Sequence, residues 1–185
     1  MTKSVLFRFV ECPMFIPIQC LAPVSERDSK VPAIKLLVIW FGANDSCLKP
    51  SPQHVPLDKF AENLRGWIDK LHSPQSRYYS PDTRIILISP PPVNTYQRRA
   101  NLESRDPPRL LDRNFETTRA YAQAVRDVAL EKGVGFTDVW GTLWQAAGKR
   151  EEALSRYLYD GLHLNRAGYK VCTRTLERLV LNAGS

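Results

Sequence analysis

Long apolar runs are absent from this sequence of 185 residues. The longest notable run covers residues 36–43, and a membrane-spanning helix needs roughly 20 apolar residues. Near the N-terminus, Arg8 and Glu11 interrupt the apolar stretch that a signal peptide would need. We therefore expect no membrane span and a cytoplasmic, intracellular location.

Cysteine and glycine are also scarce, with four and nine residues respectively. No two cysteines form a C-x-x-C pair, so the sequence predicts neither a zinc site nor a disulfide framework. The pair Gly133 and Gly135 lacks the third glycine of a dinucleotide-binding fingerprint. His54 and His72 stand in no recognised metal-ligand spacing. We expect no metal and no organic cofactor.

Basic residues outnumber acidic ones by 26 to 19, which makes the net charge +7. The densest basic group lies within residues 98–113, where acidic residues interrupt it and no regular aromatic spacing accompanies it. We interpret this group as a solvated loop and the start of a helix, and we expect no nucleic-acid partner. An alternative is that the arginines between Arg98 and Arg113 bind a nucleic acid or another acidic partner.

Short apolar runs alternate with helical patterns along the chain. Runs rich in Ile, Val or aromatic residues predict buried strands at residues 36–41, 84–89 and 134–139. Helical spacing predicts helices at residues 56–71, 107–132 and 166–181, with a partly helical segment at 141–157 and long loops at 73–83 and 90–106. This order predicts an α/β fold with a parallel sheet and helices on both faces.

Three residues are predicted to mark helix ends. Asp106 is the expected N-cap of the helix at 107–132, and Gly133 is its expected left-handed stop. Asn165 is the expected cap of the last helix.

The first candidate for chemistry directly follows a predicted strand. Gly42 permits a sharp turn there, and the side-chain amide of Asn44 could donate a hydrogen bond to a developing oxyanion. Asp45 and His54 are further candidates for the rim of such a site. Asn and Asp also stabilise turns for local reasons alone, which is the simpler interpretation of this motif.

The second candidate precedes the last helix. Asp160 stands three residues before His163, a spacing that places both side chains on the same side of one helical turn. The carboxylate could then accept from Nδ1–H and leave Nε2 as a general base. The alternative interpretation is a partly buried histidine in a loop.

Together these motifs resemble the SGNH (GDSL-like) hydrolases. The resemblance extends over about residues 14–181, and segments 53–57, 85–92 and 160–165 are similar to the isoamyl acetate-hydrolysing esterase branch, especially its fungal members. It implies a flavodoxin-like three-layer fold and hydrolysis of short-chain carboxylic esters without a cofactor. It also implies that Asn44 is an oxyanion donor, Asp160 the orienting acid and His163 the general base.

The sequence departs from the family pattern at the nucleophile. The family's serine lies in a Gly-Asp-Ser block, and no such tripeptide occurs in the printed sequence. We expect residues 1–30 to be an atypical segment and residues 31–185 to be a partial domain that lacks the family's first strand, first helix and second strand. Serines at other positions are not expected to replace the nucleophile: Ser25, Ser29, Ser46 and Ser89.

Two consequences follow for activity and folding. We expect this chain to have little esterase turnover. One alternative is a non-catalytic protein that binds esters or alcohols. Another is that the sequence is an incomplete gene model of an active esterase. The absent first strand would leave the strand at 36–41 with an open edge. Residues 5–10 have the pattern of a short strand that could pair there.

Overall fold

In the part of the chain that the structure describes, a parallel three-stranded sheet forms the centre. The computed structural model describes residues 23–27 and 34–181. Within them, β1 (Leu36–Ile39), β2 (Arg84–Ile88) and β3 (Gly135–Thr137) pair in the order β1-β2-β3. The predicted parallel strands are confirmed, although each ends earlier than expected.

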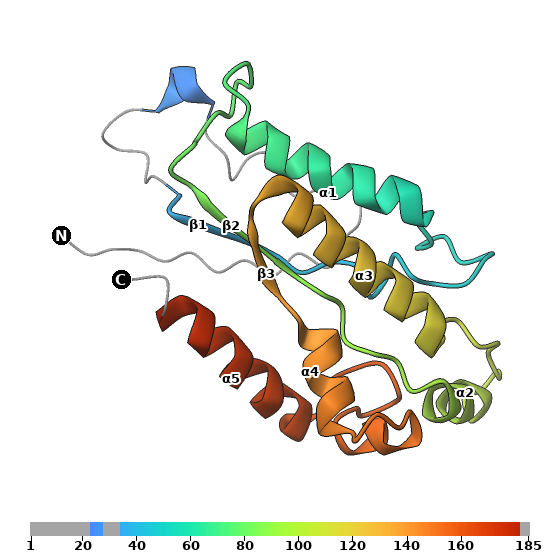
Figure 1. Cartoon of the computed structure of the whole chain (residues 1–185). Helices are drawn as coiled ribbons and strands as arrows, with labels where there is room; N and C mark the ends of the chain where they lie inside the picture. Colours follow the sequence, from blue (N-terminus) through green and yellow to red (C-terminus); the bar gives the residue numbers. More distant parts are fainter. Residues whose placement is uncertain (1–22, 28–33, 182–185) are drawn as a thin grey trace.

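Helices cover both faces of this sheet, as predicted. One face carries α1 (Leu57–His72) and α3 (Phe115–Lys132), and the other carries α4 (Val139–Ala146) and α5 (Arg166–Leu181) (Figure 1). Within the described residues, Val24–Glu26 and Glu152–Arg156 form 3₁₀ helices. The α/β fold class is therefore confirmed.

The central strand β2 shows why both faces need a cover. Ile85 and Leu87 pack in the core on the side of α1 and α3, while Ile86 and Ile88 pack in the core on the side of α4 and α5. Alternate side chains of a strand point to opposite faces, so an apolar strand must be buried on both sides. Figure 1 shows this strand between the two helical layers.

The chain between β2 and β3 differs from the prediction. Residues 95–103, expected to lie in a loop, form α2 (Thr95–Glu103). The long helix begins at Phe115 rather than at residue 107, and Asn114 caps it by accepting a hydrogen bond from the backbone N–H of Thr117. The prediction that Asp106 is its N-cap is wrong.

The predicted stop of α3 and the cap of α5 are both present. Gly133 follows α3 with φ at +62°, in the left-handed region. Oδ1 of Asn165 accepts from the backbone N–H groups of Ala167 and Gly168 at 2.9 and 3.0 Å. These ends agree with the sequence because helix caps depend on contacts within a few residues.

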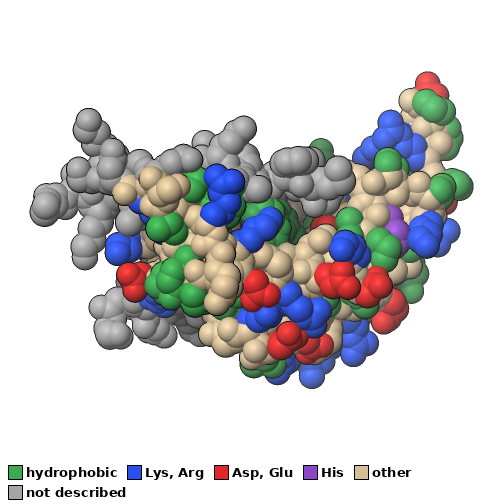
Figure 2. Space-filling view, turned by 90° about the horizontal axis from the view of Figure 1, so that it is seen from above, with side chains coloured by type: hydrophobic (Ala, Val, Ile, Leu, Met, Phe, Trp, Pro, Cys, Tyr) green, Lys and Arg blue, Asp and Glu red, His purple; other side chains and the backbone are tan. Residues whose placement is uncertain are grey.

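Charges of opposite sign are mixed on the surface shown in Figure 2, in the parts that are not grey. Two ion pairs connect α1 with α3: Arg65 with Glu131 at 2.8 Å and Lys132 with Asp69 at 2.9 Å. None of the helices within the described residues is long and apolar enough to cross a membrane. Residues 5–10, the predicted edge strand, lie outside the described residues, and the boundary at residue 30 stays a prediction.

Candidate active site

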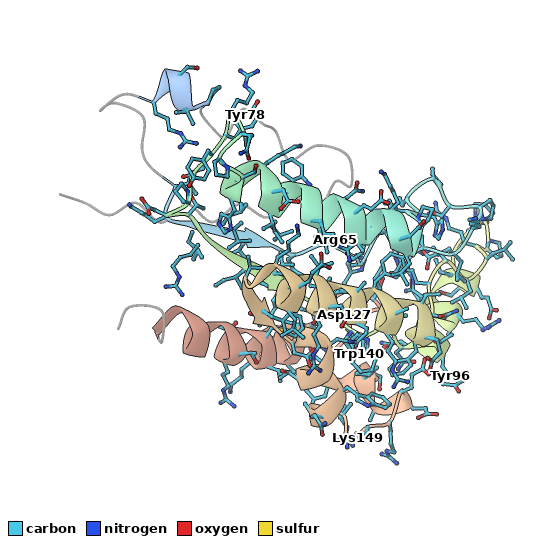
Figure 3. The ribbon with its side chains drawn as sticks, turned by 45° about the horizontal axis from the view of Figure 1, so that its top comes forward. Arg65, Tyr78, Tyr96, Asp127, Trp140 and Lys149 are labelled. Atoms are coloured by element: carbon cyan, nitrogen blue, oxygen red, sulfur yellow. The ribbon has the colours of Figure 1, made fainter. Side chains whose placement is uncertain are left out.

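The loops that follow the strands gather at one end of the sheet. In Figure 1 the loop after β1 and helix α2 lie at the right of the view, and the chain between α4 and α5 lies at the bottom, next to α2. Figure 3 shows Tyr96 of α2 at this end, and its side chain is exposed. In open parallel sheets ligands bind beyond the carboxyl ends of the strands, so this end is where a site is expected.

A tight turn directly after β1 carries Asn44. Gly42 has φ at +108°, and its backbone N–H donates to Oδ2 of Asp45 at 3.0 Å. A Cβ atom at Gly42 would lie 3.0 Å from Cγ of Pro90, which follows β2. Glycine is needed here because the turn combines a positive φ with close packing.

Asp45 supports this turn from inside the protein. Burial raises the pKa of Asp45, and the hydrogen bond from Gly42 partly opposes that rise. The side chain of Asp45 is buried, so it holds the turn and is not exposed at the rim of the site, where the sequence placed it. His54 belongs to the same loop, where Nδ1 lies 2.6 Å from the carbonyl oxygen of Cys47.

The side-chain amide of Asn44 is oriented by an arginine. Oδ1 of Asn44 accepts from Nη2 of Arg113 at 2.8 Å. Arginine can only donate, so this contact identifies the amide oxygen and turns the donor group Nδ2 away from Arg113. An amide N–H₂ with this orientation can serve as an oxyanion donor.

Asp160 and His163 form a hydrogen-bonded pair. Nδ1 of His163 lies 3.0 Å from Oδ2 of Asp160, while Oδ1 accepts from the backbone N–H groups of Leu162 and His163 at 3.1 and 2.9 Å. An ionised carboxylate only accepts, so the proton lies on Nδ1, and the lone pair of the neutral ring lies on Nε2.

The backbone around this pair is a turn and not the expected turn of helix. Leu158 and Leu164 form an isolated antiparallel bridge that closes the turn, and Gly161 within it has φ at +82°. Asp160 and His163 meet because the carboxylate caps the backbone of this turn. The spacing indicated the contact, but the helical geometry assumed for it is wrong.

Burial and charge differ sharply within the pair. The Asp160 side chain is 6% exposed, whereas that of His163 is 71% exposed. Burial alone would raise the pKa of Asp160, but the N–H groups of His163 and Leu162 outweigh it and hold that pKa below its ordinary value. Asp160 therefore stays ionised beneath an accessible imidazole, as a base of this type requires.

Two arginines that the sequence analysis placed in a solvated group are buried here. Arg98 and Arg113 are each 4% exposed. Nε and Nη2 of Arg98 donate to the two carboxylate oxygens of Asp112 at 2.9 and 2.7 Å, and Nη1 of Arg113 donates to Oδ2 of Asp112 at 2.7 Å. The surface interpretation is wrong for both arginines, because their side chains are buried and paired with Asp112.

Arg98, Asp112 and Arg113 connect the turn that carries Asn44 with the Asp160–His163 pair. Besides Asp112, Arg98 binds Oδ2 of Asp160 through Nη1 at 2.7 Å, and Arg113 binds Asn44. We refer to Arg98, Asp112 and Arg113 as the arginine bridge. Sequence reasoning missed it, and the only signal was the interleaving of acidic residues with these arginines.

Ser46 and Ser89 are occupied in structural hydrogen bonds. Ser46 is buried and its Oγ contacts the carbonyl oxygen of Ala43 at 3.3 Å. Ser89 is also buried, and its Oγ accepts from the backbone N–H of Trp140 at 3.0 Å. Ser25 is exposed, and Ser29 lies outside the described residues. Across residues 23–27 and 34–181, no three His, Cys, Asp or Glu residues are grouped so as to hold a metal ion.

Comparisons with known proteins assign the family. Residues 18–171 match the GDSL-like lipase/acylhydrolase family. The chain belongs to this family. A GDSL esterase/lipase of Arabidopsis thaliana is 36% identical over 166 residues, which cover 88% of this chain and 64% of that protein.

Relatives also confirm the branch suggested by the sequence. Isoamyl acetate-hydrolyzing esterase 1 homologs of Rattus norvegicus and Homo sapiens are 38% and 35% identical over 136 residues each. The match covers 71% of this chain and 50% of each relative. The chain therefore spans between half and two thirds of the length of these curated family members.

Solved structures of a lipase/acylhydrolase and an esterase share the fold. A lipase/acylhydrolase from Enterococcus faecalis matches with a TM-score of 0.56 and 22% identity, covering 82% of this chain and 62% of that one. The acetylxylan esterase Axe2 from Geobacillus stearothermophilus matches with a TM-score of 0.55 and 20% identity, covering 81% and 60%.

Proposed function

We propose that this chain carries the general-base and oxyanion-binding half of a carboxylic ester hydrolase site. The observation that carries the proposal is the buried Asp160 carboxylate on Nδ1 of His163, linked through the arginine bridge to the oriented amide of Asn44. Membership of the GDSL-like family supports this assignment.

Each of the three residues has a distinct role in the proposed chemistry. His163 would take the proton of the attacking hydroxyl on Nε2 and return it to the leaving alcohol. Asp160 would keep the ring in the required tautomer and stabilise the imidazolium that forms. Asn44 would donate to the oxyanion of the tetrahedral intermediate.

The nucleophile is the part that the printed sequence does not contain. There is no Gly-Asp-Ser tripeptide, and Ser46 and Ser89 are buried. Removal of the catalytic serine of a serine hydrolase lowers kcat by about 10⁶. We therefore propose that the chain as printed has negligible ester turnover, and that short-chain esters are the substrates of a form that includes the nucleophile. The names of the isoamyl acetate-hydrolyzing relatives support that substrate class.

A direct assay tests the low activity. The purified chain should hydrolyse isoamyl acetate and p-nitrophenyl acetate no faster than its His163→Ala variant, and a fluorophosphonate probe should not label it stoichiometrically. Stoichiometric labelling together with turnover that depends on one serine would refute this part of the proposal. Saturable binding of isoamyl alcohol without turnover would favour the non-catalytic alternative.

The transcript provides the test of the assigned roles. Sequencing upstream of the codon for Met14 shows whether an in-frame Gly-Asp-Ser block exists. In a protein that includes such a block, Asn44→Ala should lower kcat by about 10² to 10³, and His163→Ala should lower it further. Equal activity of either variant and the parent protein would exclude the assigned role.

A further inference from the structure

The arginine bridge is a charged cluster that the proposed chemistry does not use directly, with two buried arginines and an Asp112 side chain that is 27% exposed. Asp112 touches neither Asn44 nor Asp160, yet its carboxylate binds both arginines that do. We propose that Arg98 and Arg113 are positioning residues whose orientation is shared through Asp112, so that one carboxylate aligns the general-base pair and the oxyanion donor together. This inference depends on the proposed function for its catalytic meaning.

Arg98 reaches two carboxylates with one planar group. Nε and Nη2 donate to Asp112, while Nη1 donates to Oδ2 of Asp160, the oxygen that also contacts Nδ1 of His163. The side chains of Arg98 and Asp160 are 5% and 6% exposed, so solvent does not compete strongly for these hydrogen bonds. A planar guanidinium fixes the directions of its N–H groups, which a lysine ammonium does not do.

Arg113 holds the other half of the site in the same way. Nε donates to the carbonyl oxygen of Ala43 at 2.8 Å, and Nη2 donates to Oδ1 of Asn44 and, at 3.1 Å, to Gln53. Nη1 is directed to Asp112. Both the backbone before Asn44 and its amide oxygen are therefore bound by one guanidinium.

Backbone contacts bring these groups together independently of the charges. The carbonyl oxygen of Gly161 accepts a hydrogen bond at 2.9 Å from the backbone N–H of Asn94, which lies one turn before Arg98. The carbonyl oxygen of Asp112 accepts a hydrogen bond at 2.7 Å from the backbone N–H of Leu48, in the loop after β1. Neither hydrogen bond uses the side chain at position 112, so a substitution there removes the charge without removing a partner of these backbone contacts.

The charges of the cluster balance only when Asp112 is ionised. Two guanidinium groups then face the carboxylates of Asp112 and Asp160. Burial opposes the charge of Asp112, but the hydrogen bond from Arg98 and the charge of Arg113 hold its pKa below the ordinary value. Replacing Asp112 by asparagine leaves two buried cations with one carboxylate, which costs free energy, so we expect both arginines to reorient.

The test is nuclear magnetic resonance of the full chain with an Asp112→Asn substitution. Long-range ¹H–¹⁵N spectra report which ring nitrogen of His163 carries the proton, and the side-chain amide resonances of Asn44 report its surroundings. We expect the variant to lose the pure Nδ1–H signature of His163 and to shift the Asn44 amide. The ring signals of His72, bound to the carbonyl oxygen of Thr83, should not change.

Matched variants separate positioning from general destabilisation. Asp69→Asn removes the ion pair with Lys132 on the α1–α3 surface and should leave both signatures unchanged. Arg98→Lys keeps the charge without the planar group, and it should disturb His163 even if Asp112→Asn does not fold. An unchanged His163 tautomer and Asn44 amide in a folded Asp112→Asn or Arg98→Lys variant would overturn the proposal.

Failure of this proposal is distinguishable from failure of the proposed function. The resonance experiment measures the resting geometry of the chain and needs no turnover. If the His163 and Asn44 resonances change in the variants but a protein that includes the nucleophile block has no esterase activity, the proposed function is wrong and the coupling through Asp112 is retained. If the resonances do not change but that protein is an active esterase, the coupling is wrong and the function is retained.

Discussion

Gly161 lies in the turn between Asp160 and His163 and packs tightly against the start of α2. It has φ at +82°, and a Cβ atom would lie 2.4 Å from the backbone nitrogen of Arg98 and 2.7 Å from the carbonyl oxygen of Asn94. Both are backbone atoms at the start of α2, so neither can rotate away. The sequence motif therefore contains this glycine for packing as well as for its conformational freedom.

We expect Gly161→Ala to destabilise the fold by about 2–4 kcal/mol, because a positive φ and an overpacked contact each cost free energy. Urea unfolding followed by circular dichroism measures the change. Gly66→Ala is the matched control, since Gly66 lies in α1 with no atom within 4 Å of the added Cβ. That control should be stabilised by up to about 1 kcal/mol. Equal stability of the two variants would contradict the packing role of Gly161.

At the scale of elements, the start of α3 is decided by packing as well as by capping. The ring of Phe115, its first residue, lies 5.0 Å from the ring of Trp140 and 4.7 Å from that of Trp144, measured between centroids. Figure 3 shows Trp140 at the beginning of α4. Leu110, in the segment that was expected to be helical, is instead 90% exposed. Pro107 and Asp106 resemble a helix start locally, but the aromatic cluster and Asn114 place it later.

Replacement of the two competing caps tests where α3 begins. Asn114→Ala should lower the free energy of unfolding by about 1 kcal/mol, because the backbone N–H of Thr117 loses its partner. Asp106→Ala, at the position suggested by the sequence, should change it by less than about 0.5 kcal/mol. Urea denaturation of both variants provides the comparison. A larger loss at Asp106 than at Asn114 would contradict the observed helix start.

At the scale of the whole molecule, two buried carboxylates, Asp45 and Asp160, and the partly buried Asp112 link stability to pH with opposite signs. The pKa values of Asp112 and Asp160 lie below the ordinary 3.8, and that of Asp45 lies above it. The first two contribute stability that is present above their unfolded pKa and is lost as the pH falls through the folded value. Asp45 acts in the opposite direction, since its folded state retains a proton more readily than the unfolded state does.

We expect the free energy of unfolding to fall as the pH is lowered from about 6 to about 3, where the unfolded chain takes up protons that the folded Asp112 and Asp160 do not. Asp112→Asn should make this decline shallower, while Asp45→Asn should make it steeper. Denaturant titrations at several pH values measure the slopes. Identical slopes for the two variants would contradict the assigned directions of the pKa shifts.

The alternation of strands and helices, the class of the sheet and the Asp160–His163 contact could all be predicted from the sequence. They depend on apolar periodicity or on residues three positions apart, and such patterns are local. The start of α3 and the existence of α2 could not be predicted in this way. Their positions depend on packing against segments far along the chain.

The sequence by itself therefore determined the α/β architecture and the residue types at the end of the sheet. Only the tertiary structure decided how those residues are held. Arg98 and Asp160 are 62 positions apart, and Arg113 and Asn44 are 69 apart. No local pattern distinguishes a buried arginine from a solvated one, because the carboxylates and amides that compensate its charge are brought to it by the fold.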